Sequence, residues 1–315
     1  MPVILALNLN ITNLGVLIMT NLIIKALAQT INTQTALKAH YNSDFWAIVR
    51  EQAESKLAAA IRKDGTLIWA KLPKLLGSNP KIEKTPDSDQ KYFVQILHLA
   101  PSWAALFNTC SMATLGCGIN CLNESGHGQP HMMSDGIHHV HVARVLRTLI
   151  WFRFRDQFKA KMQREIESQR VKAYRMDAIP VIRPNGTSDL RFESLWPELF
   201  AENPDFIFYD YTKDKGRNVS HIANYSLCYS VSEKTTESDI QTAFANGLNC
   251  VVVLRLKKSQ DKPALWQGRP MIDGDSHDLR FLDPKGVFVG LYAKAAAYGD
   301  QTGFVHDLEK ESYHV

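Results

Sequence analysis

The sequence predicts an α/β protein, built as an incomplete (βα) barrel or an open parallel sheet with a helical N-terminal extension. Strand-like and helix-like segments alternate after residue 90, and residues 249–256 (NCVVVLRL) are nearly continuously apolar, which is typical of a strand buried on both faces. Such alternation implies parallel strands joined by right-handed crossovers. With 45% hydrophobic and 22% charged residues, the chain has the composition of a folded globular protein.

Residues 1–90 are predicted to form a mostly helical extension. An apolar run near the start (LGVLIMTNLIIKALA) is interrupted by asparagines and preceded by no Lys or Arg, so we expect neither a membrane span nor a signal peptide there. Residues 32–63 carry apolar side chains at helical spacing, and 65–72 (GTLIWAKL) predict a short strand. Residues 75–90 are rich in Gly, Pro, Ser and Asp and predict a linker, so the main domain spans 91–315.

The main domain is expected to alternate six strands with three helical segments. Residues 137–174 have the pattern of one long helix, and Pro197 limits the helix at 192–202 to a start or a kink. A capping Thr or Ser and a terminal Gly mark the helix at 236–247. The strands are predicted at 91–101, 178–184, 205–211, 224–231, 249–256 and 286–294.

Polar loops follow most of these strands. In parallel β-α folds, the loops that leave the carboxyl ends of the strands meet at one edge of the sheet and carry the chemistry. This rule brings together a cysteine-rich loop after the first strand, residues 185–189 after the second, 210–213 after the third, 230–233 after the fourth and Arg255 after the fifth.

The cysteine-rich loop, residues 109–128 (TCSMATLGCGINCLNESGHG), is the densest functional signal in the chain. Cys110, Cys117 and Cys121 are spaced C-x6-C-x3-C among small and turn-forming residues. Such a loop lets three thiolates converge on a metal ion or an iron–sulfur cluster, and free structural thiols are the alternative. Because the chain has five cysteines, an odd number, we expect a reducing cytoplasm and not a secreted disulfide framework.

Histidines after the third loop cysteine offer an alternative to a cluster. One imidazole added to three thiolates would complete a Cys3His zinc site, of structural or nucleic-acid-binding function. The other two cysteines, Cys228 and Cys250, lie in apolar strand patterns and are predicted to be buried and inert. The histidines concerned are His127, His131, His138, His139 and His141.

Two carboxylate groups are further candidates. The segment 272–284 (IDGDSHDLRFLDP) is rich in aspartate, and a metal-dependent hydrolase would use such oxygen ligands for Mg²⁺ or Zn²⁺. The alternative is a turn-rich surface loop in which Arg280 pairs with a carboxylate. Asp189 would act as a general base or cofactor anchor, or would cap the next helix. The acidic segment contains Asp273, Asp275, Asp278 and Asp283, with His277 among them.

A basic aromatic stretch lies on the long helix. Arginines that bind phosphates beside aromatic rings that stack on bases are typical of single-stranded nucleic-acid contacts, whereas an ordinary amphipathic helix buries the rings and solvates the arginines. The formal charge of +4 does not decide between these readings. The stretch comprises Arg144, Arg147, Trp151, Phe152, Arg153, Phe154 and Arg155.

The position of the cysteine triad, after the first strand of a β-α barrel, resembles the layout of the radical S-adenosylmethionine enzymes. The resemblance implies a [4Fe–4S] cluster on Cys110, Cys117 and Cys121, with S-adenosylmethionine on the open iron. The spacing departs from the usual C-x3-C-x2-C of that superfamily. The resemblance also implies cofactor contacts from Asn185, Gly186, Thr187, Ser188, Ser230 and Ser232, and we assign Asp189 and Glu233 to catalysis.

At closer range the chain resembles a phage family labelled gene product eighty-eight. The matching motifs include TCSMATLGC-x3-C, RPNGTSDLRFE at 183–193, FYDYTK at 208–213, NYSLCYSVSE at 224–233 and IDGDSHDLRFLDPKGVFVGLYAK at 272–294. The resemblance implies a phage or prophage origin and the cytoplasm of a bacterial host. We therefore expect an iron–sulfur protein with radical chemistry on a nucleotide or nucleic-acid base, and no membrane partner.

Overall fold

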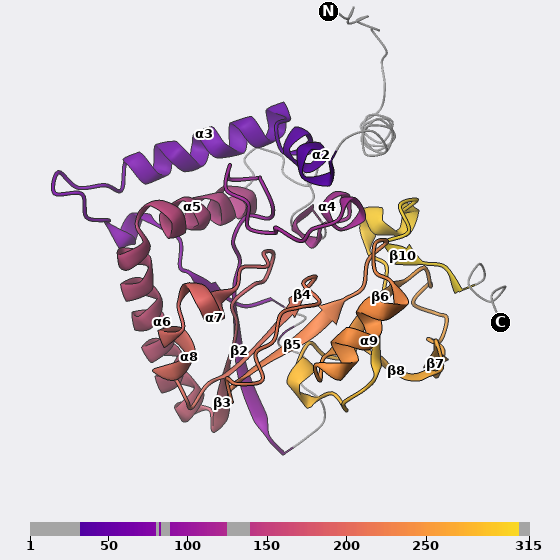
Figure 1. The fold of residues 1–315 in the computed structure, drawn as a ribbon. Helices are drawn as coiled ribbons and strands as arrows, with labels where there is room; N and C mark the ends of the chain where they lie inside the picture. The colour runs from indigo at the N-terminus through magenta and orange to yellow at the C-terminus, as the bar shows by residue number, and fades with distance from the viewer. Residues whose placement is uncertain (1–31, 80–81, 83–88, 125–138, 309–315) are drawn as a thin grey trace, which may run out of the picture.

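An open sheet of ten strands forms the centre of the molecule (Figure 1). The computed structural model describes residues 32–79, 82, 89–124 and 139–308. The strands from β2 to β6 lie side by side in chain order and are parallel, and β9 and β8 extend the parallel sheet beyond β6. The short β1 and β7 add antiparallel edges, and β10 pairs parallel with the end of β6. The strand bounds are Leu76–Gly77 (β1), Lys91–Leu97 (β2), Ala178–Arg183 (β3), Ile207–Thr212 (β4), Tyr225–Ser230 (β5), Asn249–Leu254 (β6), Leu265–Trp266 (β7), Arg269–Asp273 (β8), Phe288–Tyr292 (β9) and Val305–His306 (β10).

Local signals fix the helix starts. Asn32, Thr114 and Thr236 each accept a backbone N–H from the first turn of the helix that follows, and Thr236 forms a capping box with Asp239. The α-helices are Thr33–His40 (α2), Asp44–Ala58 (α3), Leu115–Ile119 (α4), His139–Arg153 (α5), Arg155–Arg175 (α6), Phe192–Leu195 (α7), Glu198–Ala201 (α8) and Glu237–Ala245 (α9). The 3₁₀ turns are Trp69–Lys71 (η1), Leu122–Glu124 (η2), Arg280–Leu282 (η5) and Ala295–Gly299 (η6).

The helices pack on one face of the sheet. A single large cluster joins the buried side chains of α3 and of α5 to α9 with inward residues of the strands, among them Trp46, Trp151, Phe158 and Phe208. The clusters on the opposite face contain no residue of the described α-helices. The predicted α/β fold with an open, largely parallel sheet is confirmed.

The N-terminal helices share this core. Trp46, Val49 and Leu57 of α3 are buried against α5. Residues 76–77, inside the predicted linker, form β1 and pair with Ile96 and Leu97 of β2.

Several local predictions differ from the structure. Residues 65–72 form no strand of the sheet but one isolated bridge, between Ile61 and Leu67, followed by η1, so that prediction was wrong. The single helix predicted over 137–174 is two helices, because Phe154 adopts a non-helical conformation that turns α6 away from α5. The strands β7 and β10, of two residues each, carried too short a pattern to be predicted, and the five-residue β8 was not predicted either.

Among the described helices, none combines the length and the apolar character that a bilayer span requires. The apolar run near the N-terminus, for which neither a span nor a signal peptide was expected, lies outside the described residues.

Candidate functional site

The loops after β2, β3, β4 and β5 meet at the carboxyl edge of the sheet, as the sequence predicted. Asp189, after β3, donates its backbone N–H to the carbonyl oxygen of Thr109 in the cysteine loop at 2.8 Å. The side chain of Asp189 accepts the backbone N–H of Lys213, after β4, at 2.9 Å. Lys213 in turn donates to the hydroxyl of Ser230, at the end of β5, at 3.0 Å. A chain of hydrogen bonds therefore joins the four loops.

The middle of the cysteine loop is the short helix α4, which carries Cys117. Gly116 has no room for a side chain, because a Cβ there would lie 2.3 Å from Oγ1 of Thr302 and 2.5 Å from Cβ of Phe304. Asn120 donates to the carboxylate of Asp300 at 2.8 Å. The small residues of the loop thus allow α4 to pack closely against the C-terminal segment of the chain.

Glu233 holds α4 from the other side. Its Oε1 accepts the backbone N–H of Gly116 at 2.7 Å, and its Oε2 accepts the hydroxyl of Thr114 at 2.8 Å. A carboxylate is well placed at the start of a helix, where backbone N–H groups have no partner inside the helix. In the structure Glu233 therefore holds the start of the helix in the cysteine loop, and the catalytic role predicted for it stays a prediction.

Two of the three loop sulfurs accept backbone N–H groups. Sγ of Cys110 lies 3.4 Å from the backbone nitrogen of Ser102, and Sγ of Cys121 lies 3.5 Å from that of Asn123. The Cys110 thiol also lies 3.8 Å from the carbonyl oxygen of Thr187. N–H donors aimed at sulfur stabilise a thiolate and tune the potential of an iron–sulfur centre.

The thiols of Cys110 and Cys117 are partly buried and lie close enough to affect each other electrostatically. Burial is the main cause that raises the pKa of Cys110 to about 12, and the nearby Cys117 contributes to the same rise. Burial also raises the pKa of Cys117, against the opposing effect of Lys213. Both groups therefore hold their protons at neutral pH, and a coordinated metal is the usual agent that removes them.

No three His, Cys, Asp or Glu side chains in the described ranges converge on a point that would hold one metal ion. A single zinc ion at its usual bond length of about 2.3 Å needs sulfurs about 4 Å apart. A cluster places each thiolate on a different iron and needs a wider spacing.

The loop after β3 lies directly under the cysteine loop. Asn185 donates to Asp210 through its backbone N–H at 2.9 Å and its side-chain amide at 2.8 Å, and its oxygen accepts the hydroxyl of Ser188 at 2.8 Å. Thr187 donates its hydroxyl to the carbonyl oxygen of Leu99 at 2.6 Å. The predicted cofactor-binding side chains Asn185, Thr187 and Ser188 therefore fix the shape of this loop through their own hydrogen bonds.

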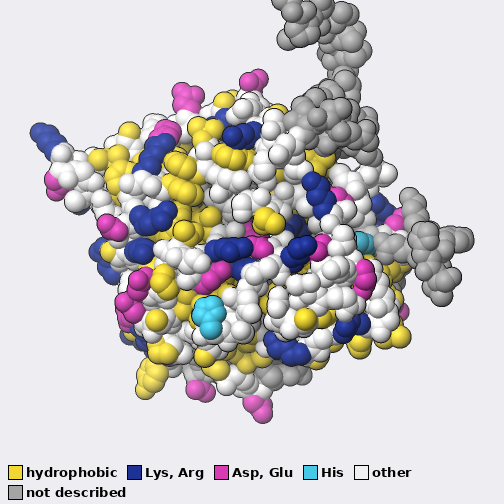
Figure 2. All heavy atoms as spheres, viewed as in Figure 1, with side chains coloured by type: hydrophobic (Ala, Val, Ile, Leu, Met, Phe, Trp, Pro, Cys, Tyr) yellow, Lys and Arg dark blue, Asp and Glu magenta, His cyan; other side chains and the backbone are white. Residues whose placement is uncertain are grey.

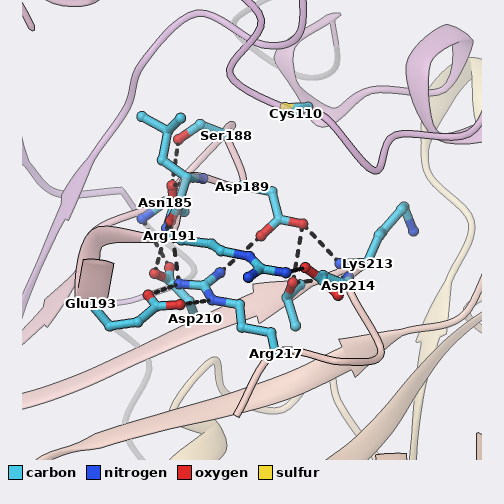
Figure 3. A network of polar contacts seen from close by, with 12 residues as sticks. Cys110, Asn185, Ser188, Asp189, Arg191, Glu193, Asp210, Lys213, Asp214 and Arg217 are labelled. Atoms are coloured by element: carbon cyan, nitrogen blue, oxygen red, sulfur yellow. Dashed lines mark hydrogen bonds and ion pairs between the residues drawn. The ribbon is translucent and has the colours of Figure 1, made fainter. Parts of the chain in front are cut away.

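Asp189 belongs to a buried ionic network beside Cys110 (Figure 3). Arg217, only 1% exposed, donates to Asp189 at 2.9 Å and binds Glu193 through two nitrogens at 2.7 and 2.8 Å. Burial raises the pKa of Asp189, and Arg217 opposes that rise. Asp210 below it is fully buried, and its pKa is raised to about 6 by burial. The network fixes a carboxylate close to the thiols.

Ser230 and Ser232, the two predicted cofactor-binding serines after β5, have different surroundings. The hydroxyl of Ser230 accepts a hydrogen bond from Lys213 at the edge of the site. Ser232 instead uses its backbone N–H and its hydroxyl in hydrogen bonds with the hydroxyl of Thr235. Lys213 lies 4.8 Å from the centre of the Phe304 ring. Its ammonium group is the positive charge that acts on Cys117.

The acidic segment gathers no ligand set for a metal. Asp273 and Asp275 pair with Lys262, Asp278 binds Arg183 at 3.0 Å, and Asp283 lies 3.3 Å from Arg280. Each carboxylate is therefore matched by a cation. The expected pairing of Arg280 is confirmed, and the hydrolase alternative has no gathered carboxylates among the described residues.

The basic aromatic stretch splits into two parts. Trp151 is fully buried, Arg153 binds Glu54 through two nitrogens at 2.6 and 2.7 Å, and Arg155 covers the Trp151 ring at 4.4 Å. This part packs as an ordinary amphipathic helix. Arg144 and Arg147, by contrast, reach toward the cysteine loop and the end of β2.

Sequence reasoning missed His98, Arg183 and Arg217. His98 follows Ile96 by two residues, so the strand alternation of β2 would have placed both on one face. Of the candidate zinc histidines, His141 is buried beside Asn123, and His127, His131 and His138 lie outside the described residues.

Comparison with curated proteins and with solved structures finds no match for this chain. A family model described as Gene product 88 matches residues 71–308, which include the cysteine loop, every strand of the sheet and the buried ionic network. The protein therefore belongs to the Gene product 88 family.

Proposed function

We propose that the protein is an iron–sulfur protein of the radical S-adenosylmethionine type that acts on a nucleotide or nucleic-acid base. Cys110, Cys117 and Cys121 would hold a [4Fe–4S] cluster. The observation that carries the proposal is the position of the cysteine loop. It follows the first parallel strand of a sheet that runs in chain order from β2 to β6, and it is hydrogen-bonded to the next loop at the same edge.

The hydrogen-bond donors and charges around the thiols suit a thiolate-ligated cluster. Two sulfurs already accept backbone N–H groups, and the cations Lys213 and Arg144 act on Cys117 and Cys121. Positive charges and N–H donors offset the negative charge of a thiolate-ligated cluster.

Residues of the neighbouring loops hold the cysteine loop in position. Glu233 fixes the start of α4 and so sets the direction of Cys117, and Asp189 ties the cysteine loop to the loops after β3 and β4. When bound, a reduced cluster supplies one electron to S-adenosylmethionine, and a site closed to water protects the reactive species. Gly186 is buried against Ile96 and His98, and its contact with the cofactor stays a prediction.

The test is metal analysis of anoxically prepared protein together with a cysteine series. We expect iron and sulfide in the wild type, and their loss in Cys110→Ala, Cys117→Ala and Cys121→Ala. Cys228→Ala and Cys250→Ala are matched controls, because both thiols are buried in strands away from the loop and should leave the iron content unchanged. One zinc per chain, lost in the same three variants, would favour the Cys3His alternative and contradict the cluster.

A small substrate suits this surface better than a long nucleic acid. The face shown in Figure 2 mixes basic, acidic and apolar side chains, and the net charge is only +4. Proteins that track a nucleic-acid backbone usually present a continuous basic groove. We therefore favour a nucleotide as the substrate class.

A further inference from the structure

We propose that Arg144 and Arg147 of α5 form a binding site for the phosphoryl group of the substrate, next to the cysteine loop. The inference rests on the proposed function, because it assigns the charged group of the nucleotide. It is carried by two neighbouring guanidinium groups that lack carboxylate partners in the described part of the chain, and by the half-buried His98, on which both act electrostatically.

The two arginines are one helical turn apart and face the same edge of the sheet. Arg147 donates from Nε to the carbonyl oxygen of Lys74 at 2.7 Å and from Nη1 to that of His98 at 3.4 Å. Arg144 donates from Nη1 to the carbonyl oxygen of Asn123 at 3.3 Å and to the side-chain oxygen of the same residue. Backbone carbonyls thus hold both side chains in place and leave part of each guanidinium group without a partner among the described residues.

Neither arginine lies within 4.0 Å of a carboxylate in the part of the chain that the structure describes. Glu165 is the carboxylate that acts electrostatically on Arg147. It is already engaged elsewhere, because it accepts the backbone N–H groups of Leu75 and Leu76 and lies 3.2 Å from the ammonium group of Lys161. Both arginines are half-buried, and the charge of each disfavours the other. An anion between them would remove this cost, because a desolvated charge needs a counter-charge.

His98 gives the second observation. Its Nδ1 is buried and has no hydrogen-bond partner among the described atoms, although Arg144, Arg147 and Arg183 all act on the ring electrostatically. That nitrogen faces Gly186, so the ring marks the site through the charges around it. Three guanidinium groups around one ring concentrate positive charge, which an anion would offset. Arginine is the preferred residue for phosphate because its planar fork donates two parallel hydrogen bonds.

The proposed phosphate site lies next to the cysteine loop, so a substrate bound there would have its charged end beside the proposed cluster. Arg144 acts electrostatically on Cys121, and His98 continues β2 toward the cysteine loop. A nucleotide whose phosphate is held there would extend its base or sugar toward the edge at which the loops meet. The phosphoryl group positions the substrate and takes no part in bond breaking.

The direct test is binding of a nucleoside 5′-monophosphate, inorganic phosphate and the uncharged nucleoside to the full chain by calorimetry. We expect saturable binding of the nucleotide, weaker binding of inorganic phosphate, and at least tenfold weaker nucleotide binding in Arg147→Gln and Arg144→Gln, since a hydrogen bond to a charged group contributes about 1.5–3 kcal/mol. Arg153→Gln is the matched control, because it removes the same charge from the same helix at a position that pairs with Glu54. Equal affinities in Arg147→Gln and Arg153→Gln would overturn the proposal.

A measurement on the wild type covers the case in which these variants fold poorly. Phenylglyoxal labelling followed by peptide mass spectrometry should show that inorganic phosphate protects Arg144 and Arg147, and leaves the labelling of Arg153 unchanged. Equal labelling of all three with and without phosphate would contradict the site. Iron content is measured separately on the same samples, so phosphate protection in a protein without iron would reject the cluster and keep the anion site.

Discussion

Gly116, one residue before Cys117, donates its backbone N–H to Glu233 at 2.7 Å. The two residues are 117 positions apart in the chain, so this bond joins the loop after β2 to the loop after β5. It shows how a short helix of small residues is held at the edge of the sheet by a carboxylate from another loop.

Glu233→Ala should destabilise the protein and weaken retention of any metal centre. The variant leaves the Gly116 N–H and the Thr114 hydroxyl without an acceptor, which costs about 1–3 kcal/mol. Urea unfolding measures the loss, and Glu233→Gln, which keeps one acceptor oxygen, should recover part of it. The exposed Glu202 provides the control variant Glu202→Ala. If Glu233→Ala unfolds at the same urea concentration as Glu202→Ala, the positioning role is wrong.

Gly186→Ala should cost about 1–3 kcal/mol of stability, the usual range for overpacking a filled site. A Cβ at this position would lie 2.4 Å from Nδ1 of His98 and 2.5 Å from Cγ2 of Ile96. Thermal unfolding tests it against Gly299→Ala, where a Cβ meets nothing within 4 Å. Equal melting temperatures in the two variants would show that the loop after β3 is not packed on β2 as described.

Arg217→Ala should be among the most destabilising single changes in the chain. It would leave Asp189 and Glu193 buried without their cation, and breaking a buried pair in this way costs about 3–5 kcal/mol. Arg191, which pairs with Asp214 at the surface and is 55% exposed, is the matched control, since exposed pairs contribute about 0–1 kcal/mol. Chemical denaturation of both variants measures the difference, and similar losses would contradict the buried network.

Asp283→Asn should remove part of the pH dependence of stability. Burial raises the pKa of Asp283 to about 6 from its usual 3.8, against the effect of Arg280. The folded protein therefore binds this proton more tightly than the unfolded chain, and the wild type loses stability as the pH rises from about 4 to about 6. Over this pH interval, the free energy of unfolding of the wild type should fall by about 2 kcal/mol more than that of the variant.

Unfolding curves at pH 4, 5, 6 and 7 measure this difference, with the exposed Asp261→Asn as control. A difference between wild type and Asp283→Asn that stays constant with pH would show that the carboxyl group is not desolvated in the folded state.

The sheet and its crossovers were predictable from the sequence because each long strand carries its own apolar pattern. The elements from β2 to β6, with β9, coincide with predicted segments to within a few residues. β7 and β10 escaped prediction because each is two residues long and depends on a partner that only the fold supplies.

The meeting of the loops was also predictable, from the rule that parallel strands point their carboxyl ends the same way. The roles of the individual side chains could not be predicted from the sequence. Glu233 and Asn185 are polar residues in the expected loops, yet their hydrogen bonds run to the chain itself. Only long-range geometry distinguishes a residue that holds a loop from one that faces a ligand. For the same reason, nothing in the pattern indicated that Arg217 lies buried between two carboxylates.

The proposed iron–sulfur cluster on Cys110, Cys117 and Cys121 can be tested directly. The most direct measurement is the Mössbauer spectrum of anoxic protein labelled with ⁵⁷Fe, combined with iron and sulfide analysis. We expect the spectrum of a [4Fe–4S] centre, which disappears when the three cysteines are replaced by alanine. A protein that binds no iron, or whose iron signal is unchanged in the triple variant, would contradict it.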